Sequence, residues 1–177
     1  MNMTKYFINE QYDVQDADAS KSFGKGEKRE DYADAWQDTG NVVLVGLAGS
    51  GKKALADLLG ERTGLDVVIP KDATGAVQAL GAGPHIIVLD DALVEVAEVQ
   101  SLIHGSGKVF YLMVDSRVLS ERVADRDDVE DRDTLWREMS ARLAVMEPVF
   151  YSVLHFIMQG IQSPEELMSD AMEKIGY

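Results

Sequence analysis

Apolar residues in this chain form short unbroken runs separated by stretches with helical spacing. The runs are rich in Val, Ile and Leu, which is typical of strands buried on both faces, and they cover residues 42–45, 66–69, 85–91, 109–114 and 154–158. The helical spacing predicts helices at residues 52–64, 92–105, 116–126, 134–146 and 163–176, with at most two helical turns at 75–83. Strands that alternate with helices predict a parallel sheet with right-handed crossovers and helices on both faces.

Residues 1–38 show neither pattern. Acidic residues, Lys, Gly and Ser dominate this stretch, so we expect a partly disordered extension that ends in a short helix around Tyr32 and Trp36. The globular domain is then predicted to cover residues 39–177. A length of 177 residues suits one domain with such a peripheral extension.

Composition excludes several classes of protein. No apolar run approaches the roughly 20 residues that span a bilayer, so we expect no membrane association. The N-terminus has no apolar signal core, and the chain has no cysteine for disulfides, thiolate metal sites or thiol nucleophiles. Together these features favour a cytoplasmic location.

The formal net charge of −14 restricts the ligands that the chain can attract. Nucleic-acid binding requires a basic patch that displaces counterions, so we do not expect this chain to bind nucleic acid. The same charge opposes the long-range attraction of nucleotides and other anions. A phosphate ligand therefore depends on a local group of backbone amides and cations, whereas the acidic extension can contact a protein partner.

One such local group follows the first predicted strand. The sequence there has the pattern of a phosphate-binding loop and consists of Gly46, Leu47, Ala48, Gly49, Ser50, Gly51 and Lys52. The glycines allow backbone angles that let amides converge on a phosphate, and the following helix adds the positive end of its dipole. Lys52 is expected to reach the terminal phosphates, which makes ATP or ADP the candidate cofactor.

The next position departs from the pattern, because Lys53 stands where a Ser or Thr normally coordinates Mg²⁺. A protonated lysine does not coordinate a metal ion, and its charge repels one. The ammonium group can point at the phosphates and replace part of the missing positive charge. Alternatively, the stem can lie along the helix with the charged end in solvent. Either way, Lys53 argues against phosphate transfer that relies on a bridging Mg²⁺.

Asp90 and Asp91 end the third predicted strand, next to the loop strand in a sheet of this type. In that place Asp90 can hold Mg²⁺, directly or through water, which makes it the candidate metal ligand and, with Lys52, a candidate catalytic residue. Alternatively, the two aspartates cap a helix that begins at Ala92, a role that needs no metal.

With these motifs in place, the chain resembles the shikimate kinase family of P-loop proteins. The likeness runs from residue 41 to the C-terminus and is strongest at residues 42–68 and 109–126. It implies a three-layer α/β sandwich with five parallel strands in the order 2-3-1-4-5 and helices on both faces. It also implies a lid at residues 124–133, Arg122 near the adenine, and a lid arginine, Arg126 or Arg132, at the phosphates.

The chain departs from the family at positions that would bind shikimate. The acidic motif after the second strand is reduced to Asp72, and residues 65–84 are too few for the helical substrate-binding insert. Residues 90–92 replace a glycine triplet, and Met146 replaces an arginine. The lid contains six acidic residues and two arginines. Because shikimate carries a carboxylate that arginines would bind, we do not expect this chain to phosphorylate shikimate.

Two functions are compatible with these observations. The chain can be a binding or regulatory module, a pseudoenzyme that keeps the shikimate kinase scaffold and holds a nucleotide without Mg²⁺ or holds none. Alternatively, it can be an ATP-dependent kinase that phosphorylates a hydroxyl of shikimate or of another small molecule. In that case Lys52 stabilises the transferred charge and Asp90 is the metal ligand or base. The binding or regulatory module is favoured, because the chain lacks the Mg²⁺-binding hydroxyl and the residues that would bind shikimate.

Overall fold

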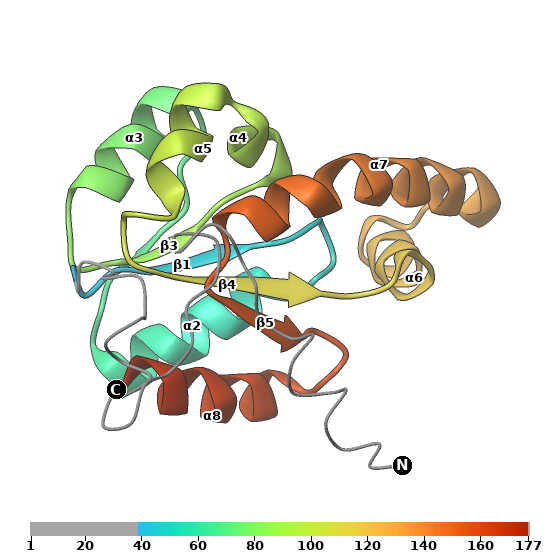
Figure 1. The fold of residues 1–177 in the computed structure, drawn as a ribbon. Coiled ribbons are helices and arrows are strands. Elements are labelled where there is room, and N and C mark those ends of the chain that lie inside the picture. Colours follow the sequence, from blue (N-terminus) through green and yellow to red (C-terminus); the bar gives the residue numbers. More distant parts are fainter. Residues whose placement is uncertain (1–38, 177) are drawn as a thin grey trace, which may run out of the picture. The chain divides into compact units, whose positions relative to one another are not determined.

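The computed structural model describes residues 39–176, so the extension predicted at residues 1–38 and its short helix lie outside the described residues. Five parallel strands form one sheet in the order β2-β3-β1-β4-β5 (Figure 1). They are β1 (Val42–Val45), β2 (Val67–Val68), β3 (Ile86–Val88), β4 (Lys108–Met113) and β5 (Phe156–Gln159). The predicted parallel sheet and its strand order, with β1 at the centre, are confirmed.

Helices cover both faces of the sheet and make it the middle of three layers (Figure 1). One face carries α2 (Lys52–Thr63) and α8 (Pro164–Ile175). The other face carries α3 (Ala73–Gly81), α4 (Asp91–Glu95), α5 (Ala97–Ile103) and α7 (Arg132–Val153). The remaining helix, α6 (Ser116–Asp127), follows β4 and packs against α7.

The central strand β1 is apolar at every position because both of its faces are covered. Val43 and Val45 pack in the core beneath α3, α5 and α7, whereas Val42 and Leu44 pack in the core beneath α2 and α8. All four side chains are at most 1% exposed. This strand is therefore a rigid base for the segment that follows it.

Most helices lie within two residues of their predicted bounds, and two differ more. The helix expected at residues 92–105 is divided into α4 and α5 by Val96, whose backbone is extended, and β-branched residues are weak helix formers. α7 continues beyond Met146 and through Pro148 to Val153. Because Phe150 and Val153 are at most 2% exposed in the core, their burial outweighs the cost of a proline inside the helix.

Asn41 connects three segments at the amino end of the sheet. Its Nδ2 donates hydrogen bonds to the carbonyl oxygens of Ala82 (2.9 Å) and Ser106 (3.1 Å), and its Oδ1 accepts one from the backbone N–H of His85 (2.8 Å). The residue is only 2% exposed. One side chain therefore satisfies three backbone groups and fixes the starts of β3 and β4 relative to β1.

Replacing Asn41 with Ala is expected to lower the free energy of unfolding by about 2–4 kcal/mol, because the Ala82 carbonyl and the His85 N–H lose this partner, while the Ser106 carbonyl keeps the bond from the Thr39 hydroxyl. Urea denaturation followed by circular dichroism measures this change. Ser101→Ala is a control, since the exposed Ser101 hydroxyl donates its hydrogen bond to the carbonyl oxygen of Glu98 in its own helix. An effect of Asn41→Ala no larger than that of Ser101→Ala would contradict the role of Asn41.

Candidate functional site

The connection between β1 and α2 turns sharply at three glycines. Gly46, Gly49 and Gly51 have φ angles of 151°, 84° and 93°, which lie in the region that favours glycine. A Cβ atom at Gly49 would also lie 3.0 Å from the carbonyl oxygen of Leu119, so this position has little room for a side chain. The glycine spacing found in the sequence thus has a steric reason, and it curves the backbone into a loop at the end of β1.

The first turn of α2 is open to a ligand. Gly51 is its N-cap and has no side chain to accept a hydrogen bond from the first-turn N–H groups, and no acidic residue lies in the first turn. A helix start of this kind leaves backbone N–H groups without a partner inside the helix and carries the positive end of the helix dipole. Both properties favour an anion at this place.

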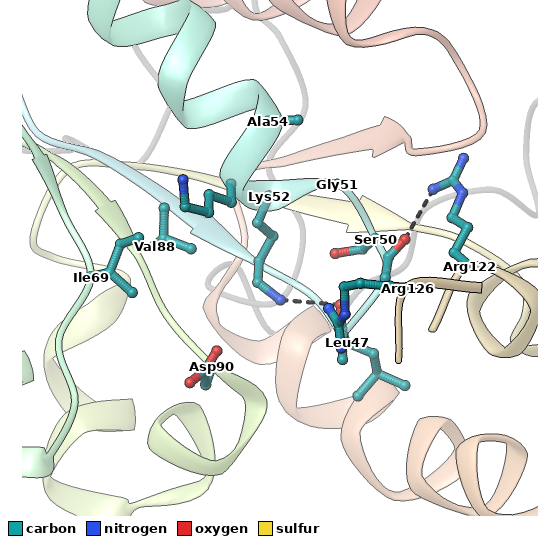
Figure 2. Close-up of a pocket in the computed structure, with 13 residues that line it drawn as sticks. Leu47, Ser50, Gly51, Lys52, Ala54, Ile69, Val88, Asp90, Arg122 and Arg126 are labelled. Atoms are coloured by element: carbon teal, nitrogen blue, oxygen red, sulfur yellow. Dashed lines mark hydrogen bonds between the residues drawn. The ribbon is translucent and has the colours of Figure 1, made fainter. Parts of the chain in front are cut away.

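The loop and the start of α2 border a pocket of about 450 Å³ (Figure 2). The pocket is lined by Leu47, Ala48, Gly49, Ser50, Gly51, Lys52, Lys53, Ala54, Ile69, Val88, Asp90, Arg122 and Arg126. The fold thus brings together all the site residues suggested by the sequence, apart from Gly46 and Arg132.

Three lining residues, Ala54, Ile69 and Val88, were not predicted as site residues. Val88 is the last residue of β3, and Ile69 directly follows β2. The sequence gives little indication that Ile69 and Val88 are site residues, because both belong to apolar runs that are typical of any buried strand. Their role becomes recognisable once the sheet is known to be parallel, since ligands bind at the carboxyl ends of parallel strands.

The ammonium group of Lys52 lies inside the loop. Its Nζ donates hydrogen bonds to the carbonyl oxygens of Gly46 and Leu47, the second at 3.1 Å, and the residue is 8% exposed. Burial lowers the pKa of Lys52 to about 8, although the charges of Asp90 and Asp91 offset part of this effect. The bonded partners of the ammonium group are carbonyl oxygens, so a bound anion would reduce the cost of burying its charge.

Lys53 points away from the loop. Its Nζ lies 3.1 Å from Oδ2 of Asp57, one turn further along α2, and its side chain is 70% exposed. The structure therefore has the second of the two orientations considered from the sequence, with the charged end in solvent. Ala54, the next residue, has no hydroxyl either, so this turn of the helix offers no side-chain oxygen to a metal ion.

The two aspartates that follow β3 have different roles. Asp91 is the first residue of α4, one position before the predicted start at Ala92, and its Oδ2 lies 2.6 Å from Nε of Arg142 in α7. Asp90 is at the N-cap, but its side chain accepts no capping hydrogen bond. Helix capping therefore does not explain Asp90, whose carboxylate lines the pocket on the side of Lys52 (Figure 2).

Two arginines of α6 reach the pocket. Nη1 of Arg122 donates a hydrogen bond to the carbonyl oxygen of Gly49 at 3.1 Å, which ties α6 to the loop (Figure 2). Arg126 also lines the pocket, but its guanidinium group forms two hydrogen bonds with the neighbouring Asp127. Arg122 is thus bonded to a backbone carbonyl and Arg126 to a carboxylate. To bind a phosphate, Arg126 would have to break its ion pair with Asp127.

The lid expected at residues 124–133 is mostly helical, since only residues 128–131 lie between α6 and α7. Arg132 pairs with Asp125 at 2.7 Å and lines a separate groove with Arg117 and Trp136. Of the two lid arginines, Arg126 is therefore the one that the structure places at the pocket.

The positions that the resemblance assigned to shikimate binding have structural roles. Asp72 caps α3, because its Oδ1 accepts a hydrogen bond from the backbone N–H of Gly75 at 2.7 Å. Met146 is fully buried in the core. Arg142, one turn earlier in α7, forms ion pairs with Asp91 and with Glu95, the latter at 2.8 Å. A carboxylate-bearing acceptor would have to compete with these acidic residues for Arg142.

The connection between β5 and α8 supports the loop from a third direction. A Cβ atom at Gly160 would lie 2.4 Å from Cγ2 of Val114 and 3.1 Å from the carbonyl oxygen of Ser50. Gly160 therefore packs directly on the loop backbone, which is also attached to β1 and bonded to Arg122 of α6. The loop is therefore held by β1, by α6 and by the β5–α8 connection.

The described residues contain no group of three or more His, Cys, Asp or Glu side chains arranged to hold a metal ion. Nor does any helix in residues 39–176 have the length and apolar character needed to cross a membrane. What the pocket does offer is a set of backbone amides, a buried lysine and a single carboxylate, that of Asp90. This arrangement suits a phosphate group.

Known proteins with similar sequences are shikimate kinases. No family model matches the chain. Shikimate kinase 2 of Yersinia pseudotuberculosis is 26% identical over 167 residues, covering 77% of this chain and 96% of that protein. Shikimate kinase 2 of Yersinia enterocolitica is 27% identical over 164 residues, covering 76% of this chain and 94% of that protein.

Solved structures of similar fold include two shikimate kinases. The enzyme from Bacteroides thetaiotaomicron has a TM-score of 0.67 at 14% identity and covers 77% of this chain and 98% of its own. The enzyme from Acinetobacter baumannii, in complex with shikimate, has a TM-score of 0.65 at 17% identity, with 76% and 92% covered. The YorR protein of Bacillus subtilis, in complex with phosphorylated GDP, has a TM-score of 0.62 at 14% identity, with 77% and 96% covered. The resemblance found in the sequence is confirmed.

Lys52 is expected to make the protein more stable as the pH rises from about 8 to 10.5. In this range the folded state loses the Lys52 proton, because its pKa is lowered to about 8, while the unfolded state keeps it up to the ordinary value of 10.5. The unfolded state then binds more protons, so the free energy of unfolding increases with pH, by on the order of 3 kcal/mol. Urea denaturation of the wild type and of Lys52→Met across this range isolates the effect, because other titrating groups cancel in the difference.

Lys53→Met is the matched control for this measurement, since the Lys53 side chain is 70% exposed. Its stability should follow that of the wild type at every pH. Parallel pH profiles for the wild type and Lys52→Met would show that Lys52 is not buried as a cation.

Proposed function

We propose that this shikimate-kinase-like P-loop protein binds a nucleotide or a phosphate anion without Mg²⁺, and that it acts as a binding or regulatory module rather than as a shikimate kinase. The observation that carries the proposal is the contrast between the two lysines of the loop. Lys52 is buried at the open start of α2, ready to meet an anion. Lys53, where a metal-binding hydroxyl is normal, is turned toward Asp57.

Metal-independent binding is supported by the side chains around the pocket. Mg²⁺ favours oxygen ligands, and in kinases of this type a loop hydroxyl and a strand-end carboxylate hold it. Among the described residues that line the pocket, Asp90 is the single carboxylate, and the buried Lys52 places a cation in the same pocket. Backbone amides and Lys52 can bind a phosphate without Mg²⁺, because the amide N–H dipoles and the ammonium group both direct positive charge at the phosphate.

The arrangement of α3, α4 and α7 argues against shikimate as an acceptor. The carboxylate of shikimate calls for a free arginine, but Arg142 is engaged by Asp91 and Glu95. Met146, at the position of another arginine of the family, is buried in the core. Asp72, the remaining candidate for binding the hydroxyls, caps α3.

A second candidate function is an ATP-dependent kinase that acts on another small molecule. It is favoured by the Asp90 carboxylate, which lines the pocket near Lys52 and is not used as a helix cap. In such an enzyme Asp90 would accept the proton of an acceptor hydroxyl, and Lys52 would stabilise the phosphate charge. The neighbouring structures include shikimate kinases and a deoxyadenosine kinase with bound dATP, which keeps this candidate open.

We propose in addition that the acidic residues 1–38 contact a protein partner. Their composition suggested this role, and they lie outside the described residues. A cytoplasmic location fits the module but stays a prediction from composition.

Calorimetric titration with ATP and ADP tests the binding proposal. The affinity should change by less than about threefold when Mg²⁺ is added in excess, because residues 53 and 54 offer no hydroxyl and Asp90 alone would hold the ion weakly. Lys52→Ala should abolish binding, since it removes the only buried cation of the loop. Strong dependence on Mg²⁺ in the wild type would contradict the proposal.

Lys53→Thr restores the hydroxyl and is expected to make ATP binding more dependent on Mg²⁺. Asp57→Ala is the matched control, because it breaks the Lys53–Asp57 ion pair without adding a hydroxyl. Its response to Mg²⁺ should equal that of the wild type. If Lys53→Thr and Asp57→Ala respond alike, residue 53 does not decide the use of the metal.

Turnover separates the module from the kinase. Release of ADP from ATP should stay at background with shikimate or deoxyadenosine as acceptor if the chain is a module. If an acceptor does stimulate ADP release, Asp90→Asn should lower that rate by roughly a hundredfold or more while nucleotide affinity is kept. Such a result would replace the module with the kinase.

A further inference from the structure

Ser50 carries the only side-chain hydroxyl between Gly46 and Ala54. In this loop the positions after Lys52, where a hydroxyl is normal, are Lys53 and Ala54. The loop has therefore kept a hydroxyl at a place where the phosphate-loop pattern does not ask for one.

The hydroxyl of Ser50 is buried and lacks a partner within the part of the chain that the structure describes. The residue is 1% exposed, and its Oγ forms no hydrogen bond there. Two other buried serines contrast with it, since the hydroxyls of Ser106 and Ser120 donate to backbone carbonyls at 2.7 Å and 2.8 Å. A buried hydroxyl without a partner is costly, so such a group calls for an explanation.

The position of the hydroxyl indicates what the partner is. Ser50 lines the pocket, and its side chain is turned toward the inside of the loop, on the side of Lys52 (Figure 2). A Cβ atom at Gly46 would lie 2.8 Å from Oγ of Ser50, so this oxygen lies close to the backbone of Gly46. The carbonyl of Gly46 is also a partner of the Lys52 ammonium group. Because the Lys52 ammonium group also contacts Gly46, the charge on this side of the loop disfavours a metal ion and favours an anion.

We propose that the Ser50 hydroxyl donates a hydrogen bond to an oxygen of the phosphate bound in the loop. The inference rests on the proposed function and deepens it. Residue 50 then provides a hydroxyl directly to the anion, whereas residue 53 would have provided one to the metal ion. The donor of this bond is already positioned in the loop and has no acceptor among the described residues.

Ser50→Ala tests the inference because two effects of opposite sign are expected. The thermal midpoint of the ligand-free protein should stay the same or rise by about 2 °C, since an unsatisfied buried group is removed. The affinity for pyrophosphate and for ATP in Mg²⁺-free buffer should fall roughly tenfold or more, since a hydrogen bond to a charged group is lost. Ser50→Cys, which has a weaker donor of similar shape, should lie between the two proteins.

Ser106→Ala is the matched control, because this buried hydroxyl is bonded to Ile103 and is not among the residues that line the pocket. It should lower the thermal midpoint and leave the affinity for pyrophosphate unchanged.

The outcomes separate this inference from the proposed function. If the wild type binds neither pyrophosphate nor ATP, both fail. If the wild type binds and Ser50→Ala binds equally well, the role of Ser50 alone is overturned. A ligand-free Ser50→Ala protein that melts at a lower temperature than the wild type would show that the hydroxyl has a structural partner, and this also overturns the inference.

Discussion

The turn from β1 into α2 is the constraint on which the rest of the site depends. β1 is buried on both faces, so its end is fixed, and the chain must start a helix on one face within a few residues. Gly46, Gly49 and Gly51 make this geometry accessible because their φ angles are positive. As a result, the open end of α2 and the buried Lys52 face one hollow, and the electrostatic character of the pocket follows from backbone shape more than from the number of charged residues.

Net charge and local charge have opposite effects in this molecule. The chain carries a formal charge of −14, yet the loop region has an uncapped helix start and a lysine bonded to carbonyl oxygens. The nearby arginines are largely occupied, Arg126 by Asp127 and Arg142 by Asp91 and Glu95. The acidic residues around the pocket thus keep cations in place and limit the number available to a ligand.

Periodicity and one glycine pattern were enough to predict the five parallel strands, the position of the loop and most of the pocket lining. Both signals are local: buried strands require apolar runs, and the tight turn requires glycines. The sequence could not show which partner each charged residue chooses, because Arg142 meets Asp91 and Glu95 only after α7 crosses α4. Nor could it show that Ile69 and Val88 border the pocket, that Val96 breaks a helix, or that the buried Ser50 hydroxyl has no partner within residues 39–176.

Gly160 gives the molecule a property that its loop motif alone does not have. This residue is more than a hundred positions away in the chain, yet a side chain here would meet Val114 and the carbonyl of Ser50, so only a glycine fits against the loop. The curvature of the loop is therefore a property of the whole fold. Grafting the short glycine-lysine segment onto another strand–helix junction would transfer the loop sequence without the packing that supports it. The recipient scaffold would need its own equivalent of the β5–α8 connection.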